Sequence, residues 1–356
     1  MEINIEILNC IKSLQKEIAD LKIKQSESNE IIEQLGGNNN FNKIKTKFNY
    51  HTKRINNLLE NRIGCYDKEE DLKIGVCIRA KDEQNIISDW TKHYLNLGFD
   101  KIIIYDNLSE PSIYETLNNN NLINEKVIIN IDTKKVTNQL GCYEDAVNNN
   151  QDLDWLLLCD ADEFLWLHDN EKSIKNFLSK FSKETSTILI NWLTYGTSGN
   201  KTYNKDKTIY EQFTQREDYE FTWNQMVKSF VRPMFCTEFQ NVHAFVNIIC
   251  PYVKNVYNED IIIFWPETDM RCIYKDEKMS DSTPLLLVHY MTLDEESMLK
   301  KQNKQLRAKI IPHISGTNDE KYSLEWYHRE HNWSDLSSRG GFKDNNYDIR
   351  MFKYIK

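Results

Sequence analysis

The sequence predicts an α/β protein whose mainly parallel sheet is flanked by helices and preceded by an N-terminal helical segment. From residue 71 onward, short apolar runs alternate with amphipathic helical stretches, which is the order of successive βαβ units. Before residue 63, apolar residues instead recur at heptad spacing. A chain of 356 residues is long enough for one large domain with an appendage.

The N-terminal segment, residues 1–62, has the pattern of a coiled coil. Ile11 and Ile18 share one seam position of the heptad, and Leu14 and Leu21 share the other. A Gly-Gly-Asn-Asn-Asn run then separates this stretch from a second helical one. We expect two helices that hold a homo-oligomer together. The alternative is a single amphipathic helix lying on the α/β body.

The α/β domain is expected over residues 71–310, with apolar runs as strands and amphipathic stretches as helices. Strands are expected at residues 73–78, 101–105, 127–131, 155–159, 187–193 and 285–289. Helices are expected at residues 86–97, 112–119, 143–148 and 294–309. Residues 311–356 are polar apart from Trp326 and Trp333, and we expect them to form a tail that packs on this domain.

Composition excludes several classes of partner. The 45 basic and 54 acidic residues give a net charge of -9, which predicts no binding to nucleic acid. Eight scattered cysteines without a CxxC pair predict buried free thiols, not a zinc site or a disulfide framework. The start of the chain has no signal peptide, and no run approaches the roughly 20 apolar residues of a membrane span. We therefore expect a cytoplasmic protein.

Two carboxylates, Asp160 and Asp162, directly follow the predicted strand at residues 155–159. Carboxylates in this arrangement can share a hard divalent cation, which would bridge the oxygens of a diphosphate. Such a cation neutralises the charge that builds on a departing nucleoside diphosphate. The alternative is a solvated acidic turn or a helix cap.

A second strand ends in an acid, Asp106, which is followed by Asn107. Because the carboxyl ends of parallel strands meet at one edge of a sheet, both acids should face one crevice. These side chains suit a base or a ribose, although a turn with a side-chain cap would use the same residues.

Lys228 and Arg232 lie in an otherwise apolar segment, where a buried cation needs a partner. A diphosphate is one candidate partner. The alternatives are solvated strand positions or ion pairs with protein carboxylates.

Several segments, taken in their order along the chain, resemble glycosyltransferase family 92 and the related family 2 enzymes. They are VCIRAKDE at 76–83, Trp90, HYLNLG at 93–98, IYDN at 104–107, WLLLCDADEF at 155–164, NW at 191–192, GTSG at 196–199, VKS at 227–229, NVH at 241–243 and HY at 289–290. The resemblance covers roughly residues 72–305. It implies a GT-A fold, a nucleotide-sugar donor with UDP favoured, Mn2+ or Mg2+ as cofactor, and sugar transfer with inversion. The acceptor would be a glycan, a protein or a small molecule.

The resemblance also implies roles for individual residues. Arg79, Asp82 and Asp106 would line the nucleoside pocket, where Asn107 also suits the base or the ribose. Asp160 would contact the ribose or the metal, Asp162 would be the principal metal ligand, and His289 would complete the metal shell. His243 would lie near the donor or the acceptor. For both histidines, packing in the core is the competing interpretation.

Inversion requires a general base, and Glu217 and Asp218 are the candidates, although most acids in such a polar stretch are merely solvated. Glu163 is expected to be structural. Two other functions remain open. A sugar-nucleotide nucleotidyltransferase would need a Gly-rich, basic N-terminal loop, which residues 76–83 lack. An inactive coiled-coil scaffold would not need Asp160, Asp162 and His289.

Overall fold

The computed structural model describes residues 65–131, 138–236, 242–243, 253–261, 279–297, 346–348 and 350–354. The predicted coiled coil at 1–62 lies outside the described residues, so that prediction and the expected oligomer stay open. Most of the helix predicted at 294–309 and most of the tail at 311–356 also lie outside them.

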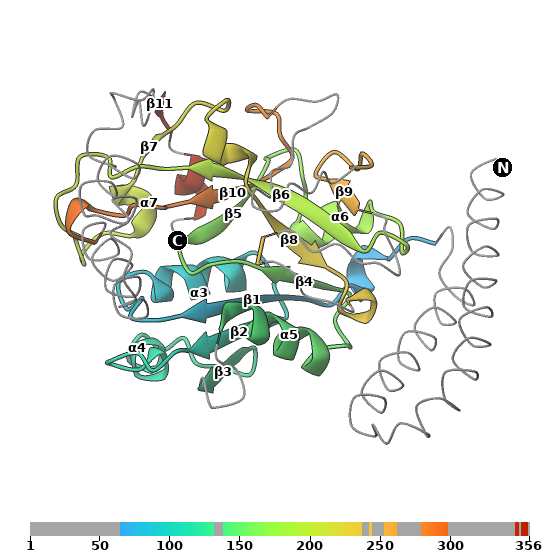
Figure 1. The fold of residues 1–356 in the computed structure, drawn as a ribbon, viewed down its shortest axis with the longest axis horizontal. Helices are drawn as coiled ribbons and strands as arrows, with labels where there is room; N and C mark the ends of the chain where they lie inside the picture. Colours follow the sequence, from blue (N-terminus) through green and yellow to red (C-terminus); the bar gives the residue numbers. More distant parts are fainter. Residues whose placement is uncertain are drawn as a thin grey trace, which may run out of the picture. The chain divides into compact units, whose positions relative to one another are not determined.

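Nine strands of the described residues form one mixed sheet in the order β3-β2-β1-β4-β8-β6-β10-β5, with β9 beside β6 (Figure 1). The strands are β1 (Ile74–Ala80), β2 (Lys101–Asp106), β3 (Val127–Ile131), β4 (Trp155–Leu158), β5 (Glu163–Leu167), β6 (Thr187–Thr194), β8 (Val227–Val231), β9 (Val253–Asn255) and β10 (Leu285–His289). From β3 to β4 all pairs are parallel. In the second half β8 and β5 run antiparallel to their neighbours. The predicted α/β class is confirmed, with a parallel first half and a mixed second half.

Helices cover both faces of the parallel half. They are α3 (Ile87–Asn96), α4 (Ile113–Asn119) and α5 (Gln139–Asn149); α6 (Ile174–Ser179) and a single turn, α7 (Ile209–Gln212), follow later in the chain. Figure 1 shows α3 and α5 on opposite sides of β1. The core follows the same division, because alternate strand residues point to opposite faces. Trp90 and Tyr94 of α3 pack with Ile78, whereas Tyr143 of α5 packs with Cys77.

Helix α5 begins four residues before the predicted start. Asn138 caps it, because its side-chain oxygen accepts the N–H of Gly141 at 2.8 Å. The earlier start places Gln139 in the first turn of the helix, at the edge of the sheet where β4 ends.

The two antiparallel strands β5 and β8 are not among the strands predicted from the apolar runs. Strand β5 begins five residues after the end of β4 but pairs with β10 on the far edge of the sheet. Strand β8 contains Lys228, a charged residue that periodicity alone does not favour in a buried strand. Both strands depend on partners distant in sequence, and local pattern does not reveal these partners.

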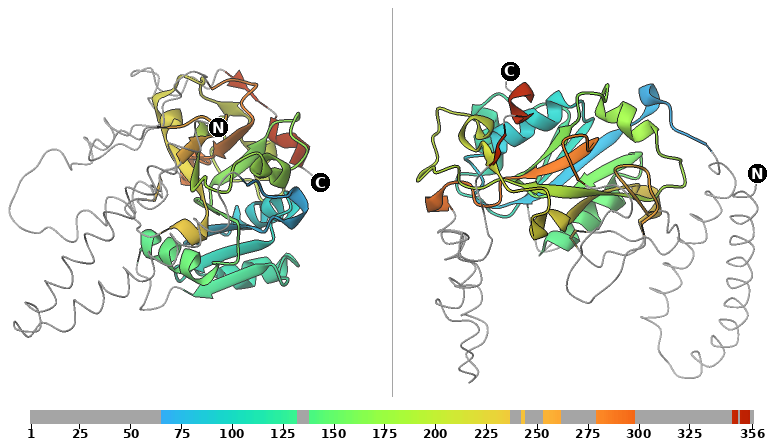
Figure 2. Two further views of the ribbon diagram at one scale, coloured as in Figure 1. Left: turned by 90° about the vertical axis from the view of Figure 1, so that its right-hand side faces the viewer. Right: turned by 90° about the horizontal axis from the view of Figure 1, so that it is seen from above.

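The C-terminal residues return to the same body. The short strand β11 (Asn346–Tyr347) pairs antiparallel with β7 (Gln215–Arg216). A 3-10 turn, η6 (Arg350–Tyr354), then lies beside α3 (Figure 2), with the rings of Tyr354 and His93 4.7 Å apart.

Two further expectations concern cysteines and membranes. Cys77, Cys142, Cys159 and Cys236 are buried and free, as predicted, and Cys65 is exposed. Within the described ranges, no helix combines the length and the apolar character needed to cross a bilayer.

Candidate functional site

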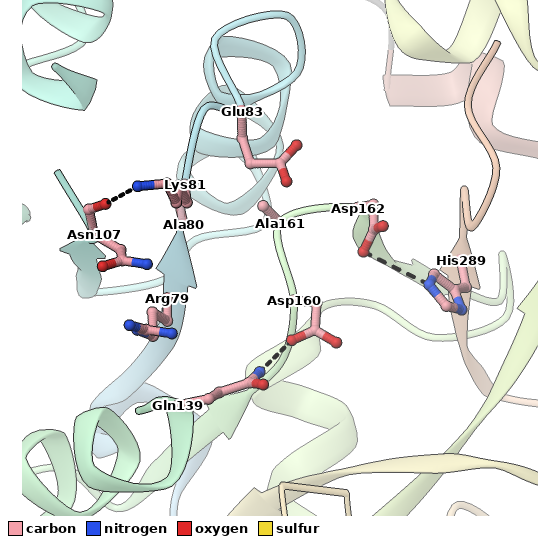
Figure 3. Close-up of a pocket in the computed structure, with 10 residues that line it drawn as sticks. All are labelled: Arg79, Ala80, Lys81, Glu83, Asn107, Gln139, Asp160, Ala161, Asp162 and His289. Carbon is pink, nitrogen blue, oxygen red and sulfur yellow. Dashed lines mark hydrogen bonds and ion pairs between the residues drawn. The ribbon is translucent and has the colours of Figure 1, made fainter. Parts of the chain in front are cut away.

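A cavity of about 290 Å³ opens at the carboxyl ends of β1 and β4 (Figure 3). This is the edge at which open α/β sheets bind ligands. Its lining residues are Arg79, Ala80, Lys81, Glu83, Asn107, Gln139, Asp160, Ala161, Asp162 and His289. Acidic, basic and amide side chains therefore converge on one space from five separate parts of the chain.

The turn between β4 and β5 carries both aspartates and is held from several sides. The N–H of Asp160 donates to Glu163 Oε2 at 2.8 Å, and the N–H of Glu163 donates back to the carbonyl of Asp160 at 3.2 Å. The N–H of Tyr290 donates to the carbonyl of Asp162 at 2.9 Å. Trp90 Nε1 and the Tyr94 hydroxyl both donate to the carbonyl of Glu163, each at 3.1 Å. These bonds fix the backbone of the turn before any ligand arrives.

Asp160 is paired with a buried lysine. Lys228 Nζ lies 2.8 Å from Asp160 Oδ2 and is fully buried, whereas the Asp160 side chain is 33 % exposed. Gln139 Nε2 donates to the other carboxylate oxygen of Asp160. Burial is the largest single influence on the pKa of Asp160 and raises it, but the charge of Lys228, its hydrogen bond and the charge of His289 together hold this pKa below its usual value. Asp160 is therefore an ionised, oriented carboxylate at the floor of the cavity.

Glu163 lies beneath this pair and is fully buried. Its Oε1 is 4.0 Å from Lys228 Nζ. Burial raises the pKa of Glu163 well above its usual value, although Lys228 acts in the opposite direction. Burial also lowers the pKa of Lys228, but Asp160 and Glu163 outweigh this and raise it. Lys228 thus keeps its charge inside the protein because carboxyl groups surround it.

Asp162 and His289 face each other across the mouth of the cavity (Figure 3). Asp162 Oδ1 and His289 Nε2 are 3.6 Å apart, and both side chains are largely buried. That separation is long for a hydrogen bond, but it suits two ligands of one cation with bonds of about 2.1 Å. The ring of His289 packs on Trp192, with centroids 4.2 Å apart, which fixes its orientation.

The donor types fit a divalent cation that accepts both oxygen and imidazole nitrogen. Among the described residues, however, no three His, Cys, Asp or Glu side chains converge on one point. The protein would thus supply Asp162 and His289, and the remaining ligands would come from a bound substrate or from water.

The four residues predicted for the nucleoside pocket separate into two groups. Arg79 and Asn107 line the cavity, and Lys81 Nζ donates to the carbonyl of Asn107 at 3.2 Å. Asp106 does not line it, because its carboxylate oxygens accept the N–H groups of Ser109 and Ile113 at 2.9 and 3.0 Å. This is the turn-capping role that the sequence left open for Asp106.

Asp82 also lies outside the cavity lining. It has φ of 57°, a left-handed conformation that Asp tolerates better than most residues. Its N–H donates to Ser109 Oγ at 2.9 Å. Asp82 therefore shapes the loop that carries two lining residues, Lys81 and Glu83.

The ring of Trp192 separates His243 from His289, one of the two candidate metal ligands. The ring of His243 is 5.5 Å from Trp192, which in turn contacts His289. The carbonyl of His243 accepts from Ser229 Oγ at 2.8 Å. Burial lowers the pKa of His243 to about 4, so its imidazole is neutral at pH 7.

The two candidate bases differ in exposure. Asp218 is exposed, whereas Glu217 is only 3 % exposed. The N–H of Glu217 donates to the carbonyl of Thr194 at 3.0 Å, and Thr194 is the register partner of His289. Arg216 forms an isolated antiparallel bridge with Tyr195, so Glu217 lies opposite Thr194, on the face of His289 and about 10 Å from it, but Glu217 is not among the residues that line the cavity.

Arg232 is outside the site. It is fully buried at the opposite end of β8, where its Nη2 lies 2.8 Å from Asp67 Oδ2. Its guanidinium also lies 4.0 Å from the centre of the Trp155 ring. The suggestion that a diphosphate is its partner is wrong, because protein groups at the amino end of β4 already surround Arg232.

Four residues of the site were not predicted: Gln139, Lys81 and Glu83 line the cavity, and Trp192 supports His289. No local pattern marks Gln139, which reaches Asp160 only because α5 begins at that residue. Lys81, Glu83 and Trp192 lie within the segments quoted for the family resemblance, which could have indicated them.

Comparisons with known proteins confirm the resemblance. The sequence model of glycosyltransferase family 92 matches residues 73–322, whereas no curated protein sequence gives a match. Among solved structures, mannosyltransferase PcManGT from Pyrobaculum calidifontis in complex with GDP-Man and Mn2+ is 10 % identical, with a TM-score of 0.28. TarS 1-349 from S. aureus is 11 % identical, with a TM-score of 0.30. HddC from Yersinia pseudotuberculosis is 12 % identical, with a TM-score of 0.25.

The structural matches are partial. They cover 41 %, 46 % and 50 % of this chain and 43 %, 48 % and 94 % of the other chains, in the same order. This chain therefore spans less than half the length of the first two. The family match is broader, because it extends over most of the sequence and includes both aspartates, Lys228 and His289. The chain belongs to glycosyltransferase family 92.

Proposed function

We propose that this chain transfers a sugar from a nucleoside diphosphate donor, with UDP favoured, to an acceptor hydroxyl, with inversion at the anomeric carbon. Mn2+ or Mg2+ is the proposed cofactor. The observation that carries the proposal is the pair Asp162 and His289, 3.6 Å apart at the mouth of a cavity whose wall also carries Arg79 and Lys81. Family membership supports the same reaction class.

Asp162 and His289 would hold the cation through Oδ1 and Nε2. When bound, the cation supplies Lewis-acid neutralisation of the charge on the departing diphosphate. Asp160 would contact the ribose or the cation, because Lys228 and Gln139 keep its carboxylate ionised and oriented. Lys228 thus acts on the donor through Asp160 and not by direct contact.

The remaining lining residues suit the donor. Arg79 and Lys81 carry positive charge toward the cavity and would bind diphosphate oxygens. Asn107 offers an amide to the base or the ribose. Asp82 and Asp106 would hold the loop and the turn that present these groups.

Transfer itself needs an acceptor oxygen and a base. The oxygen attacks the anomeric carbon while the bond from that carbon to the diphosphate oxygen breaks, and the hydroxyl proton passes to the base. Glu217 is the stronger candidate base, because it is buried on the face of His289. His243 and Trp192 would line the neighbouring part of the site.

The test begins with ligand binding. We expect UDP with Mn2+ to raise the melting temperature, because a ligand present at 100 times its Kd stabilises the native state by about 2.7 kcal/mol. GDP and CMP, each with and without Mn2+, serve as comparisons. Release of nucleoside diphosphate from the matching sugar donor then measures turnover. A nucleotidyltransferase would instead form a nucleotide sugar from a nucleoside triphosphate, and a scaffold would do neither.

Asp162→Asn tests the metal site. We expect turnover to fall on the order of 10³-fold, with loss of the Mn2+-dependent part of the thermal shift, because the cation contributes several kcal/mol. Asp152→Asn is the matched control, since that carboxylate is 53 % exposed and pairs with Lys101 at the opposite end of the sheet. Normal metal-dependent turnover by Asp162→Asn would refute the mechanism.

A further inference from the structure

We propose that Asp348, in the C-terminal segment at residues 346–354, is a positioning residue of the active site, because it orients Glu217 through the guanidinium of Arg216. The inference rests on the proposed function, which makes Glu217 the base. The segment lies beyond residues 73–322, which the family model matches. The catalytic unit of this protein would thus include residues outside the family match.

The segment is attached directly to the strand that precedes Glu217. Strand β11 pairs antiparallel with β7, and the N–H of Asp348 donates to the carbonyl of Thr214 at 2.7 Å. After Asp348, the chain buries Met351, which is 2 % exposed. The strand pairing and this hydrogen bond bring Asp348 against β7, and Met351 holds the following residues in the core.

At this point two guanidinium groups meet one carboxylate. Asp348 Oδ2 accepts from Arg216 Nε at 2.6 Å and from Arg350 Nε at 2.7 Å. The three side chains are each about one-tenth exposed. A second carboxylate, Asp281, lies 3.0 Å from Arg350 Nη2, so the charges of the cluster balance. The ring of Tyr219 covers Arg216, whose guanidinium carbon is 4.3 Å from the ring centre.

Arg216 connects this cluster of charged side chains to the backbone of Glu217. Arg216 Nη1 donates to the carbonyl of Glu217 at 2.8 Å. On its other side, the N–H of Glu217 donates to Thr194. The peptide groups flanking Glu217 are therefore held from both directions, by the strand next to His289 and by Arg216, whose orientation depends on Asp348.

Attachment alone does not explain this arrangement. Burying several charges is a costly way to fasten a segment that strand pairing and Met351 already fasten. The guanidinium of Arg216 instead donates to the Asp348 carboxylate through Nε and to the Glu217 carbonyl through Nη1. A planar group with two fixed partners sets the orientation of the groups that it links. The structure thus assigns Asp348 the role of a positioning residue for Glu217.

The test compares Asp348→Asn with Lys353→Gln in the full chain. Lys353 belongs to the same segment but contacts Leu167 and Asp169, away from Glu217. Release of UDP from UDP-glucose, UDP-galactose and UDP-N-acetylglucosamine is measured with Mn2+, together with UDP affinity. Amide hydrogen exchange reports on the peptide that contains Glu217, and Arg216→Lys provides a second disruption of the same link.

We expect Asp348→Asn to accelerate exchange at Glu217 and to lower the maximal rate of UDP release by about 10- to 100-fold, with UDP affinity unchanged. Lys353→Gln should change neither. In a Glu217→Gln background, Asp348→Asn should have no additional effect on the rate, because both act on one group.

Three results would overturn the inference: unchanged exchange at Glu217, a normal rate despite faster exchange, or independent effects of the two substitutions. Failure of the unmodified chain to bind UDP or to release it from any donor would refute the proposed function instead. The exchange measurement then decides by itself whether Asp348 fixes Glu217.

Discussion

The two ends of strand β8 carry the same kind of residue in different surroundings. Lys228, within β8, and Arg232, the residue directly after β8, are both fully buried cations, four positions apart. Lys228 pairs with Asp160, whose side chain is 33 % exposed toward the cavity. Arg232 pairs with Asp67, whose side chain is 8 % exposed, and it stacks on Trp155. The exposure of the partner carboxylate is what distinguishes the two ends.

This difference separates a functional charge pair from a structural one. At the Arg232 end, each donor group already has a protein partner, because carbonyls of Thr185, Ser182 and Asp154 accept its N–H groups. At the Lys228 end, Asp160 still presents part of its carboxylate to the space where a ligand would bind. A buried cation therefore indicates a binding site only where its partner remains accessible.

The largest effect should come from Arg232→Met. Removing one partner of a closed, buried ion pair leaves the other charge uncompensated, so we expect the free energy of unfolding to fall by about 3–5 kcal/mol. Urea denaturation measures this change, and UDP affinity of the folded variant should match that of the parent chain. Arg232→Lys is the control that keeps the charge but loses the planar fork. A loss of less than about 1 kcal/mol in the free energy of unfolding would show that the Arg232–Asp67 pair is not a structural ion pair that distinguishes this end of β8.

Lys228→Met should have a smaller effect on stability and a specific effect on activity. Water in the cavity can solvate the Asp160 carboxylate, so the variant should lose only about 1–3 kcal/mol. Without Lys228, Asp160 is no longer fixed, and turnover should fall about 100-fold. Denaturation and diphosphate release measure the two effects on one preparation. If Lys228→Met lost stability but kept full turnover, both ends of β8 would be structural.

His93 is a third buried basic side chain, and the effect of pH on stability tests how its burial differs from that of Lys228 and Arg232. His93 is 1 % exposed, and its partners are the carbonyl of Leu165 at 2.8 Å and the hydroxyl of Tyr210 at 2.9 Å. A carbonyl can only accept, so Nε2 carries the proton and Nδ1 accepts from Tyr210. None of the carboxylates in the part of the chain that the structure describes pairs with His93, and burial lowers its pKa to about 3.

The sign of the pH effect follows from the direction of that shift. Between pH 6.5 and 3 the unfolded chain binds a proton at His93 and the folded chain does not, so stability falls as pH falls through this window. From pH 7 to pH 5 we expect His93 to contribute a loss of about 2 kcal/mol. Urea denaturation of the parent and of His93→Gln at both pH values isolates this contribution. Equal losses in the two proteins would mean that His93 is protonated in the folded state.

The sequence by itself determined the α/β order, most strands of the parallel half, the position of Asp160 and Asp162 at a strand end, and the family. These features depend on short apolar runs and on the residues that directly follow them. The strand at 285–289 was predicted with both bounds correct, and His289 at its end lies opposite Asp162 in the structure.

Only the tertiary structure decided which charged residues act together. Lys228 is 68 residues from Asp160, Gln139 is 21 residues from it, and Asp348 is 132 residues from Arg216. The sequence assigned Lys228 and Arg232 the same candidate role because their local patterns are alike. Their roles differ because the free energy of a buried charge depends on where its partner lies and whether water reaches that partner, and both are set by the packing of distant strands.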